Sequence, residues 1–123
     1  MKNYNDLEIY NLAYSLAIEV HKMTFKLPNY ELYEQGSQVR RSSKSIKDAI
    51  AEGYGRRRYK AEFIKFLIYA HSSCDETISQ LTMINELHFQ DNPIIELIKK
   101  YNNLGSKINK FINYVEIKKK KKK

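Results

Sequence analysis

The sequence predicts an all-α protein, folded as an antiparallel up-down-up-down four-helix bundle. Apolar residues recur every three or four positions through four separate segments of the 123-residue chain, which is the period of a helix. No run alternates polar and apolar residues, as a half-buried strand would. Gly and Pro are few, at four and two residues, so we expect short loops between the four segments.

The first predicted helix spans about residues 6–27. Asn5 or Asp6 is expected to cap its start, and Pro28 to end it. Its apolar residues step by three or four and form one stripe, comprising Ile9, Leu12, Leu16, Val20, Met23 and Leu27.

The second predicted helix spans about residues 32–54 and has three kinds of position. Its apolar residues are Leu32, Val39, Ile46, Ala49 and Ile50. Gly36, Ser42 and Ser43 are small and allow a neighbouring helix to approach closely. The other face is basic, and Gly53 is expected to be the C-terminal cap, because glycine accepts positive φ.

Two longer segments complete the predicted bundle. The third helix spans about residues 59–88, with a stripe of Phe63, Leu67, Ala70, Cys74, Thr77, Leu81 and Ile84. The fourth starts at Asn92-Pro93, an N-cap followed by proline at the first helical position. Its apolar positions are Ile94, Ile98, Tyr101, Leu104, Ile108, Phe111, Ile112 and Val115.

The predicted organisation is one domain over residues 1–117, followed by a disordered tail of six lysines at residues 118–123. The apolar stripes of the first and third helices are wider than a bundle requires, which favours self-association. The alternative is a monomer with scattered exposed aliphatic residues. One cysteine, no apolar stretch long enough to span a membrane and no secretory signal indicate a cytoplasmic protein.

The net charge of +8 is unevenly distributed. Residues 1–35 carry three Lys and five acids, net −2, and residues 69–117 carry four Lys and six acids, also net −2. Residues 36–68 carry nine Lys or Arg and three acids, net +6, and the tail adds six more positive charges. This asymmetry indicates a polyanionic partner, most simply nucleic acid. An AT-rich genome would explain the lysine tail equally well, but explains the arginines less well.

The sequence offers little for catalysis or for a cofactor. His21, His71 and His88 are far apart and share no motif, and Cys74 lies on the apolar stripe of the third helix. Zinc sites need Cys and His clusters, and di-iron bundles need Glu-x-x-His elements; neither occurs. The sequence GYGRRR lacks the third glycine and the preceding strand of a dinucleotide site. We therefore expect no enzyme, metal or cofactor.

A basic segment is the candidate binding site. Arg40, Lys44 and Lys47 recur at i, i+4 and i+7, which places them on one helix face, with Arg41 at its border. The following turn adds arginines near a helix N-terminus, which attracts anions. Two tyrosines beside them are candidates for stacking on unpaired bases. The candidate nucleic-acid-binding residues are Arg40, Arg41, Lys44, Lys47, Tyr54, Arg56, Arg57, Arg58, Tyr59 and Lys60. The alternatives are a solvated face, salt bridges within the protein or oligomer, and other anionic partners.

Residues 37–81 carry a family pattern, SQVRRSSKSIKDAIAEGYGRRRYKAEFIKFLIYAHSSCDETISQL. This stretch resembles a bacterial four-helix-bundle family named for proteins encoded in intervening sequences of 23S rRNA genes. The matching positions are Ser37, Gln38, Arg40, Arg41, Ser45, Ile46, Ile50, Ala51, Glu52, Gly53, Gly55, Arg56, Glu62, Phe63, Ile64, Phe66, Leu67, Ala70, Ser73, Glu76, Gln80 and Leu81. The first segment has the family's hydrophobic spacing, so the resemblance covers about residues 4–90. It departs at Lys47 and Ala49, where the family has proline and asparagine.

The resemblance implies a homo-oligomeric bundle, with a pentameric ring as the expected stoichiometry, and no catalytic activity. It also implies a relation to accessory proteins of diversity-generating retroelements, basic pentamers that bind nucleic acid and a reverse transcriptase. Our first hypothesis is a non-enzymatic oligomer that binds nucleic acid, with RNA or an RNA/DNA hybrid preferred. The second is an adaptor that docks an acidic partner protein, such as a reverse transcriptase. The third is an enzyme, which would need a His with a carboxylate partner in a polar cleft.

Overall fold

The computed structural model describes residues 3–89 and 92–121, without the side chains of residues 92 and 119–121. Its four long helices are α1 (Glu8–Thr24), α3 (Gln35–Gly55), α4 (Lys60–Ile84) and α5 (Asn92–Lys121). A 3₁₀ turn, η1 (Tyr4–Asp6), precedes α1, and a short helix, α2 (Asn29–Leu32), joins α1 to α3. A π-helical turn, η2 (Asn85–Phe89), follows α4.

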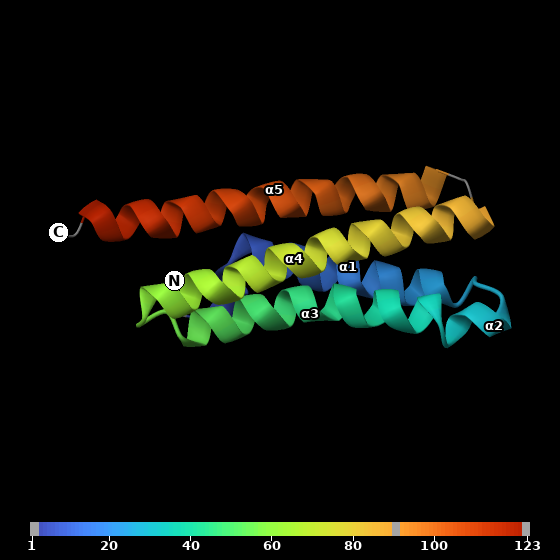
Figure 1. Ribbon diagram of the computed structural model, residues 1–123, viewed down its shortest axis with the longest axis horizontal. Helices are drawn as coiled ribbons and strands as arrows, with labels where there is room; N and C mark the ends of the chain where they lie inside the picture. The colour runs from blue at the N-terminus through green and yellow to red at the C-terminus, as the bar shows by residue number, and fades with distance from the viewer. Residues whose placement is uncertain (1–2, 90–91, 122–123) are drawn as a thin grey trace.

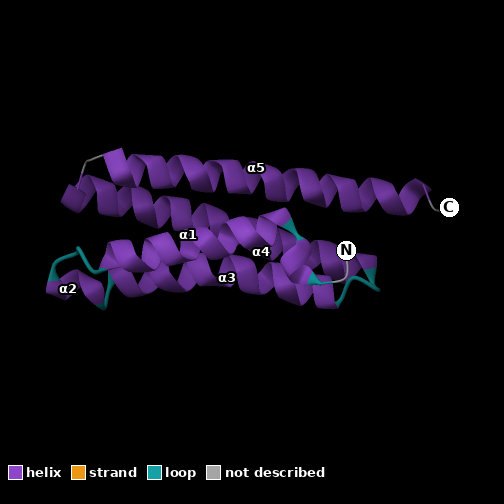
Figure 2. Cartoon of the chain, turned by 180° about the vertical axis from the view of Figure 1, so that it is seen from behind, coloured by secondary structure: helices purple, strands orange, loops and turns teal. Residues whose placement is uncertain are grey.

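The four long helices run alternately up and down (Figure 1), which confirms the predicted bundle. Helix α3 packs against α1 and α4, and α5 closes the arrangement by packing against α4 and α1. Within the described residues only helices and loops occur, as the view from behind also shows (Figure 2). None of the described helices combines the length and apolar character that a membrane span requires.

The core lies where the predicted stripes meet. Every member of the predicted stripe on α4 is buried, from Phe63 to Ile84. On α5, Tyr101, Leu104 and Ile108 are completely buried. Burial of such a stripe removes apolar surface from water at about 25 cal/mol per Å², which is the main force that holds the helices together.

The α3–α4 interface also contains small polar side chains. The Ser42 hydroxyl donates to the Gln80 side-chain oxygen at 2.7 Å, and the Thr77 hydroxyl donates to Ser42 at 2.9 Å. One turn along α3, the Ser45 hydroxyl donates to Ser73 at 3.2 Å. These hydrogen bonds satisfy buried polar groups. The serine and threonine side chains are small, so the two helices can approach closely.

The start of α1 differs from the prediction. Neither Asn5 nor Asp6 caps α1, whose N-cap is Leu7, without a side-chain hydrogen bond. Instead, Asn3 and Asp6 form a capping box around the 3₁₀ turn η1. The polar residues that indicated a cap therefore serve the turn before the helix.

The predicted second helix is divided in two. Leu32 ends α2, and α3 begins only at Gln35, after Glu34 at φ −109° and ψ −95°. At the other end, Gly53 is not the C-terminal cap, because α3 continues to Gly55 and neither glycine has positive φ. Gly53 is buried where a Cβ atom would lie 2.9 Å from the Phe66 Cβ. The glycine is required by the close approach of α4, not by backbone conformation.

The last two helices begin or end within a few residues of prediction. The α-helical hydrogen bonding of α4 ends at Ile84, and the remaining predicted residues form η2. Helix α5 begins at Asn92 and continues to Lys121, beyond the predicted domain boundary at residue 117. The last two tail lysines, 122 and 123, lie outside the described residues.

Candidate nucleic-acid interface

The predicted binding residues are divided between two places on the bundle. Lys44 and Lys47 face α1 near the middle of α3, whereas Arg56, Arg57 and Arg58 lie in the α3–α4 turn. Lys44 and Arg56 are separated by twelve residues of helix, which is roughly 18 Å. The two groups are therefore separate surfaces rather than one patch.

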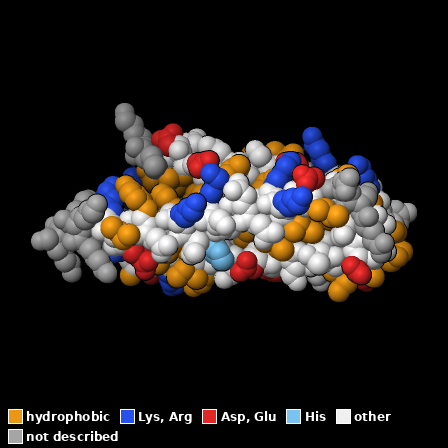
Figure 3. All heavy atoms as spheres, turned by 90° about the horizontal axis from the view of Figure 1, so that it is seen from above, with side chains coloured by type: hydrophobic (Ala, Val, Ile, Leu, Met, Phe, Trp, Pro, Cys, Tyr) orange, Lys and Arg blue, Asp and Glu red, His pale blue; other side chains and the backbone are white. Residues whose placement is uncertain are grey.

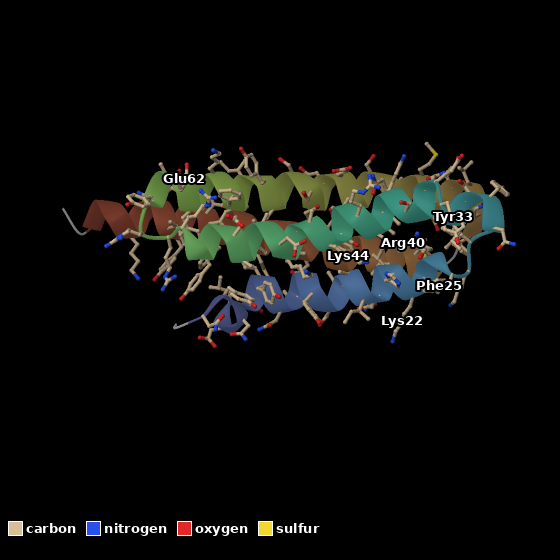
Figure 4. All side chains as sticks on the ribbon, turned by 90° about the horizontal axis from the view of Figure 1, so that it is seen from below. Lys22, Phe25, Tyr33, Arg40, Lys44 and Glu62 are labelled. Carbon is tan, nitrogen blue, oxygen red and sulfur yellow. The ribbon has the colours of Figure 1, made fainter. Side chains whose placement is uncertain are left out.

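A groove between α1 and α3 contains the first group. It encloses about 390 Å³ and is lined by Tyr14, Ala17, Ile18, His21, Lys22, Lys44 and Lys47. We call these seven residues the basic groove. Figure 4 shows Lys44 and Arg40 between α3 and α1, with Lys22 on α1 and Phe25 just after its C-terminal end. Three of the seven lining residues are lysines and none of them is acidic.

Lys47 is held in place at one end of the groove. Its Nζ lies 2.6 Å from an Asp48 carboxylate oxygen and 5.9 Å from the centre of the Tyr14 ring. The hydrogen bond with Asp48 raises the pKa of Lys47, so the side chain stays charged at neutral pH. Lys44 is exposed and, among the described residues, makes no hydrogen bond or ion pair.

His21 lines the same groove. Its pKa is lowered first by burial and then by the charges of Lys44 and Arg40. The ring meets the Phe25 ring edge to face, with 5.3 Å between the centres. At neutral pH His21 is therefore neutral, and the positive charge of the groove comes from the lysines.

Arg40 has a structural role, although it shares the predicted face with Lys44 and Lys47. One guanidinium nitrogen donates to the Thr24 hydroxyl at 2.9 Å and another to the Leu32 carbonyl at 3.0 Å. Thr24 is completely buried, and these bonds join α3 to the ends of α1 and α2. Arg41, the next residue, is exposed.

The first turn arginine is paired with acids. Arg56 Nε donates to Glu52 at 2.9 Å, and its Nη1 donates to Glu62 at 3.2 Å. The guanidinium also lies 4.9 Å from the centre of the Phe66 ring. Arg56 thus links the last turn of α3 to the first turn of α4, and its charge is largely balanced locally.

The second turn arginine is held against a tyrosine. Arg57 Nη1 donates to the Tyr54 carbonyl at 2.9 Å, and its guanidinium lies 4.0 Å from the centre of the Tyr54 ring. Tyr54 is only 6% exposed and its ring also meets Phe63 edge to face. Tyr54 therefore closes the end of the core, and stacking of a base on it, as the sequence suggested, has no free ring face to use.

The rest of the turn is more accessible. Arg58 is exposed and, within the described part of the chain, forms no hydrogen bond or ion pair. Tyr59 is 64% exposed and is the N-cap of α4, without a side-chain hydrogen bond. Lys60 donates to the Glu116 carbonyl on α5 at 2.8 Å. Arg58 and Tyr59 are thus the turn residues best placed to meet a ligand.

The opposite side of the bundle has a different charge pattern. Seen from the α5 side, basic and acidic side chains are interspersed (Figure 3). Lys100 pairs with Glu19 at 3.2 Å and Lys107 with Glu8 at 3.0 Å, which joins α5 to α1. Balanced pairs of this kind leave little net field, whereas the basic groove gathers one sign of charge.

The α1 half of the basic groove was not among the predicted site residues. Tyr14, Ile18 and Lys22 recur at i, i+4 and i+8, and Tyr14 and Ile18 are 47% and 44% exposed. That spacing was readable, but only the packing of α1 beside α3 shows that it faces Lys44 and Lys47.

The structure also forms a His–carboxylate pair that the sequence did not indicate. His88 Nε2 lies 2.8 Å from a Glu31 carboxylate oxygen, and Gln35 donates to the same oxygen at 3.0 Å. Glu31 is 5% exposed, and the pair joins α2 to the π-helical turn η2. The two residues are 57 positions apart, so no local pattern could have revealed the contact.

The remaining chemical features are the buried thiol of Cys74 and the arrangement of possible metal ligands. Burial raises the pKa of Cys74 to about 12, and its thiol donates to the Tyr101 carbonyl at 3.2 Å. A thiol of this kind is a poor nucleophile at neutral pH. Across residues 3–89 and 92–121, no three His, Cys, Asp or Glu side chains are grouped so that they could hold a metal ion.

Comparison with protein families and with curated proteins gives two results. A family model described as 23S rRNA-intervening sequence protein matches residues 5–110, which includes α1 to α4 and most of α5. No curated protein matches the chain significantly.

Proposed function

The chain belongs to the 23S rRNA-intervening sequence protein family, and we propose that it is a non-enzymatic, homo-oligomeric bundle that binds nucleic acid. RNA or an RNA/DNA hybrid is the preferred ligand, and the contacts are made mainly to phosphates. The basic groove is the main contact surface, and Arg58 with Tyr59 adds a second contact at the end of the bundle.

The concentration of positive charge in the basic groove is the observation that supports this function, because Lys22 and Lys44 make no ion pair among the described residues. Lys22 and Lys44 come from different helices and border the same groove, with Lys47 beyond them. The acid that approaches this group, Asp48, is bonded to Lys47. Lysine side chains on both sides of a groove suit a polyanion that lies along it.

Phosphate contacts predict how the affinity depends on salt concentration. Each lysine that neutralises a phosphate releases condensed counterions, so the logarithm of the association constant falls linearly with the logarithm of salt concentration. Such contacts position the ligand but read little sequence. We therefore expect binding that is steeply salt-dependent and tolerant of sequence.

The test is a fluorescence anisotropy titration of labelled RNA, RNA/DNA hybrid and DNA at several salt concentrations. Lys44→Glu should weaken binding about tenfold or more and reduce the salt slope, because a phosphate contact becomes a repulsion. Lys110→Glu is the matched control, since it makes the same charge change at an exposed α5 residue that, like Lys44, makes no ion pair among the described residues. No salt-dependent binding to any of the three ligands, or equal losses for both variants, would refute the proposal.

The turn is tested separately through Arg58. Arg56 and Arg57 are poor choices, because their replacement also breaks contacts to Glu52, Glu62 and Tyr54. Arg58→Glu should weaken RNA binding by a few-fold without changing the urea midpoint. A loss larger than that of Lys44→Glu would make the turn, not the groove, the main surface.

Self-association is the second part of the proposed function. Exposed aliphatic side chains remain on α4 and α5, and Ile68, Met83 and Ile117 are each about half exposed. A second copy of the chain would remove this surface from water. Light scattering after size exclusion should give a pentamer of 73 kDa, five times the chain mass of 14.6 kDa. A monomer mass would refute self-association.

An adaptor that docks a protein, such as a reverse transcriptase, is the second candidate function. The observation that favours it is a group of exposed aromatic side chains near α2: Phe25, Tyr30 and Tyr33 are 66%, 70% and 81% exposed. Phosphate binding does not require them, whereas protein interfaces are enriched in aromatic residues. Purified protein that binds no nucleic acid but co-purifies with an acidic partner would favour the adaptor.

A further inference from the structure

We propose that the basic groove seats an unpaired base of a single-stranded nucleic acid, with the adjacent phosphates on its lysines. This inference rests on the proposed function and narrows it, because it names the form of nucleic acid that the groove selects. Two features carry it: an apolar surface on α1 and lysines contributed by both α1 and α3.

Tyr14, Ala17 and Ile18 line the groove from α1, and we call these three residues its floor. Tyr14 and Ile18 are nearly half exposed, so apolar surface faces the ligand directly. A surface that met only phosphates would gain nothing from these side chains. A nucleobase has two flat faces of low polarity, and its stacking on an aromatic ring contributes affinity without requiring a particular sequence.

The apolar floor also distinguishes a single strand from a duplex. In a duplex the bases are paired and stacked inside, and only their edges reach the grooves. A duplex would therefore present phosphates to the lysines and leave the floor without a partner.

The lysines are positioned to hold the phosphates on either side of the base. Lys22 comes from α1, whereas Lys44 and Lys47 come from α3. Lys47 Nζ is bonded to Asp48 and lies 5.9 Å from the centre of the Tyr14 ring, so Lys22 and Lys44 are the lysines left to hold the phosphates. Beyond the floor, the contacting rings of His21 and Phe25 extend the aromatic surface towards α2.

A helix of a partner protein is the other occupant that the shape of the groove admits. The charge of the groove favours a single strand over such a helix. Apolar residues at i and i+4 on α1 would suit a helix equally well. Lysines with no acid among the groove-lining residues favour a ligand that carries a negative charge at every unit. An unlabelled acidic peptide, added as a competitor to the oligonucleotide titration described below, distinguishes the two occupants.

The experiment compares a labelled single-stranded oligouridine with an RNA duplex of the same length, by anisotropy at one salt concentration. Tyr14→Ala should weaken single-strand binding about tenfold and duplex binding by less than about twofold, because only a free base reaches the floor. Tyr14→Phe keeps the ring and should bind as the wild type does. Tyr33→Ala is the matched control, since Tyr33 is 81% exposed near α2 and outside the groove.

A second measurement does not depend on variants. Photo-crosslinking of a 4-thiouridine oligonucleotide to the unmodified protein, followed by trypsin digestion, should label the peptide of residues 3–22, which contains the floor. Three results would overturn the inference: crosslinks confined to the α3–α4 turn, equal losses for both ligands with Tyr14→Ala, or an acidic peptide that occupies the groove while the oligonucleotide binds elsewhere. In each of these cases the protein still binds nucleic acid, so the proposed function stands and only this inference fails. Absence of binding to either ligand would instead refute the proposed function.

Discussion

Replacement of Gly53 by alanine tests the reason for the glycine in the α3–α4 contact. Alanine in place of a glycine inside a helix normally stabilises a protein by roughly 0.5–1 kcal/mol, because the unfolded chain loses freedom. At Gly53 the new Cβ would lie 2.9 Å from the Phe66 Cβ and 3.3 Å from a ring carbon of Phe63. The new Cβ and the Phe66 Cβ are both fixed to their backbones, so the contact can be relieved only if α3 and α4 move apart.

The expected magnitude follows from these two opposing effects. Extra methyl groups in a well-packed contact cost about 1–3 kcal/mol, which exceeds the gain in helix propensity. We expect Gly53→Ala to lower the free energy of unfolding by about 1 kcal/mol, or the urea midpoint by roughly 0.5 M. Gly55→Ala is the matched control, because a Cβ added to Gly55 would meet no atom within 4 Å and the φ of Gly55 is not positive.

The assay is urea denaturation followed by circular dichroism at the helix band, with wild type, Gly53→Ala and Gly55→Ala measured together. Gly55→Ala should be as stable as the wild type or more stable, by about 0.5 kcal/mol. The two variants should therefore differ in sign although the chemical change is the same. If Gly53→Ala stabilises the protein as much as Gly55→Ala does, the close approach of α3 and α4 does not explain the glycine.

The other predictions concern stability and reactivity. Arg40→Met should lower the free energy of unfolding by about 2 kcal/mol in the same urea assay, because two charged hydrogen bonds to neighbouring elements are lost; a change below about 0.5 kcal/mol would contradict its structural role. His88→Ala should cost about 2 kcal/mol, since it leaves the buried Glu31 carboxylate with fewer donors. His71→Ala should cost less than about 0.5 kcal/mol, because its pair with Asp75 is exposed and longer, at 3.6 Å. Cys74, whose folded pKa is raised to about 12, should not react with a thiol reagent at pH 8 until the protein unfolds, and the urea midpoint should fall as pH rises above about 8.5, where only the unfolded thiol ionises. Rapid labelling of the folded protein would show that Cys74 is accessible.

The helices themselves were largely predictable from the sequence. The spacing of apolar residues identified the buried face of α4 completely, because burial in a bundle depends on the helix period alone. The helix ends were less predictable. Asn3 and Asp6 cap a 3₁₀ turn, and Glu34 interrupts the second segment, because local hydrogen bonds and backbone angles decide an end and several residues compete for each role.

Only the α3 part of the candidate site could be predicted from the sequence, because its basic residues recur at helical spacing along one segment. The i, i+4, i+7 spacing placed Arg40, Lys44 and Lys47 on one face, and all three do face α1. The spacing could not separate Arg40 from the two lysines, because its partners, Thr24 and the Leu32 carbonyl, come from other elements. For the same reason it could not assign Tyr14 or Lys22 to the site.

The turn and the groove differ in how far their charge is compensated, and this difference determines which surface is the better candidate for binding. Glu52 lies four residues before Arg56, so half of that compensation was readable from helix spacing. Glu62 reaches the same guanidinium only because α4 folds back antiparallel to α3. The three consecutive arginines are therefore conspicuous in the sequence but partly used by the fold, whereas the lysines of the groove, scattered over 25 positions from Lys22 to Lys47, are brought together by it. Phosphate contacts need basic side chains that are free to reach the ligand. Among the described residues Lys22 and Lys44 make no hydrogen bond or ion pair in the groove, whereas in the turn Arg56 and Arg57 are held by contacts within the protein. For this reason the groove, rather than the turn, should dominate the salt dependence of binding.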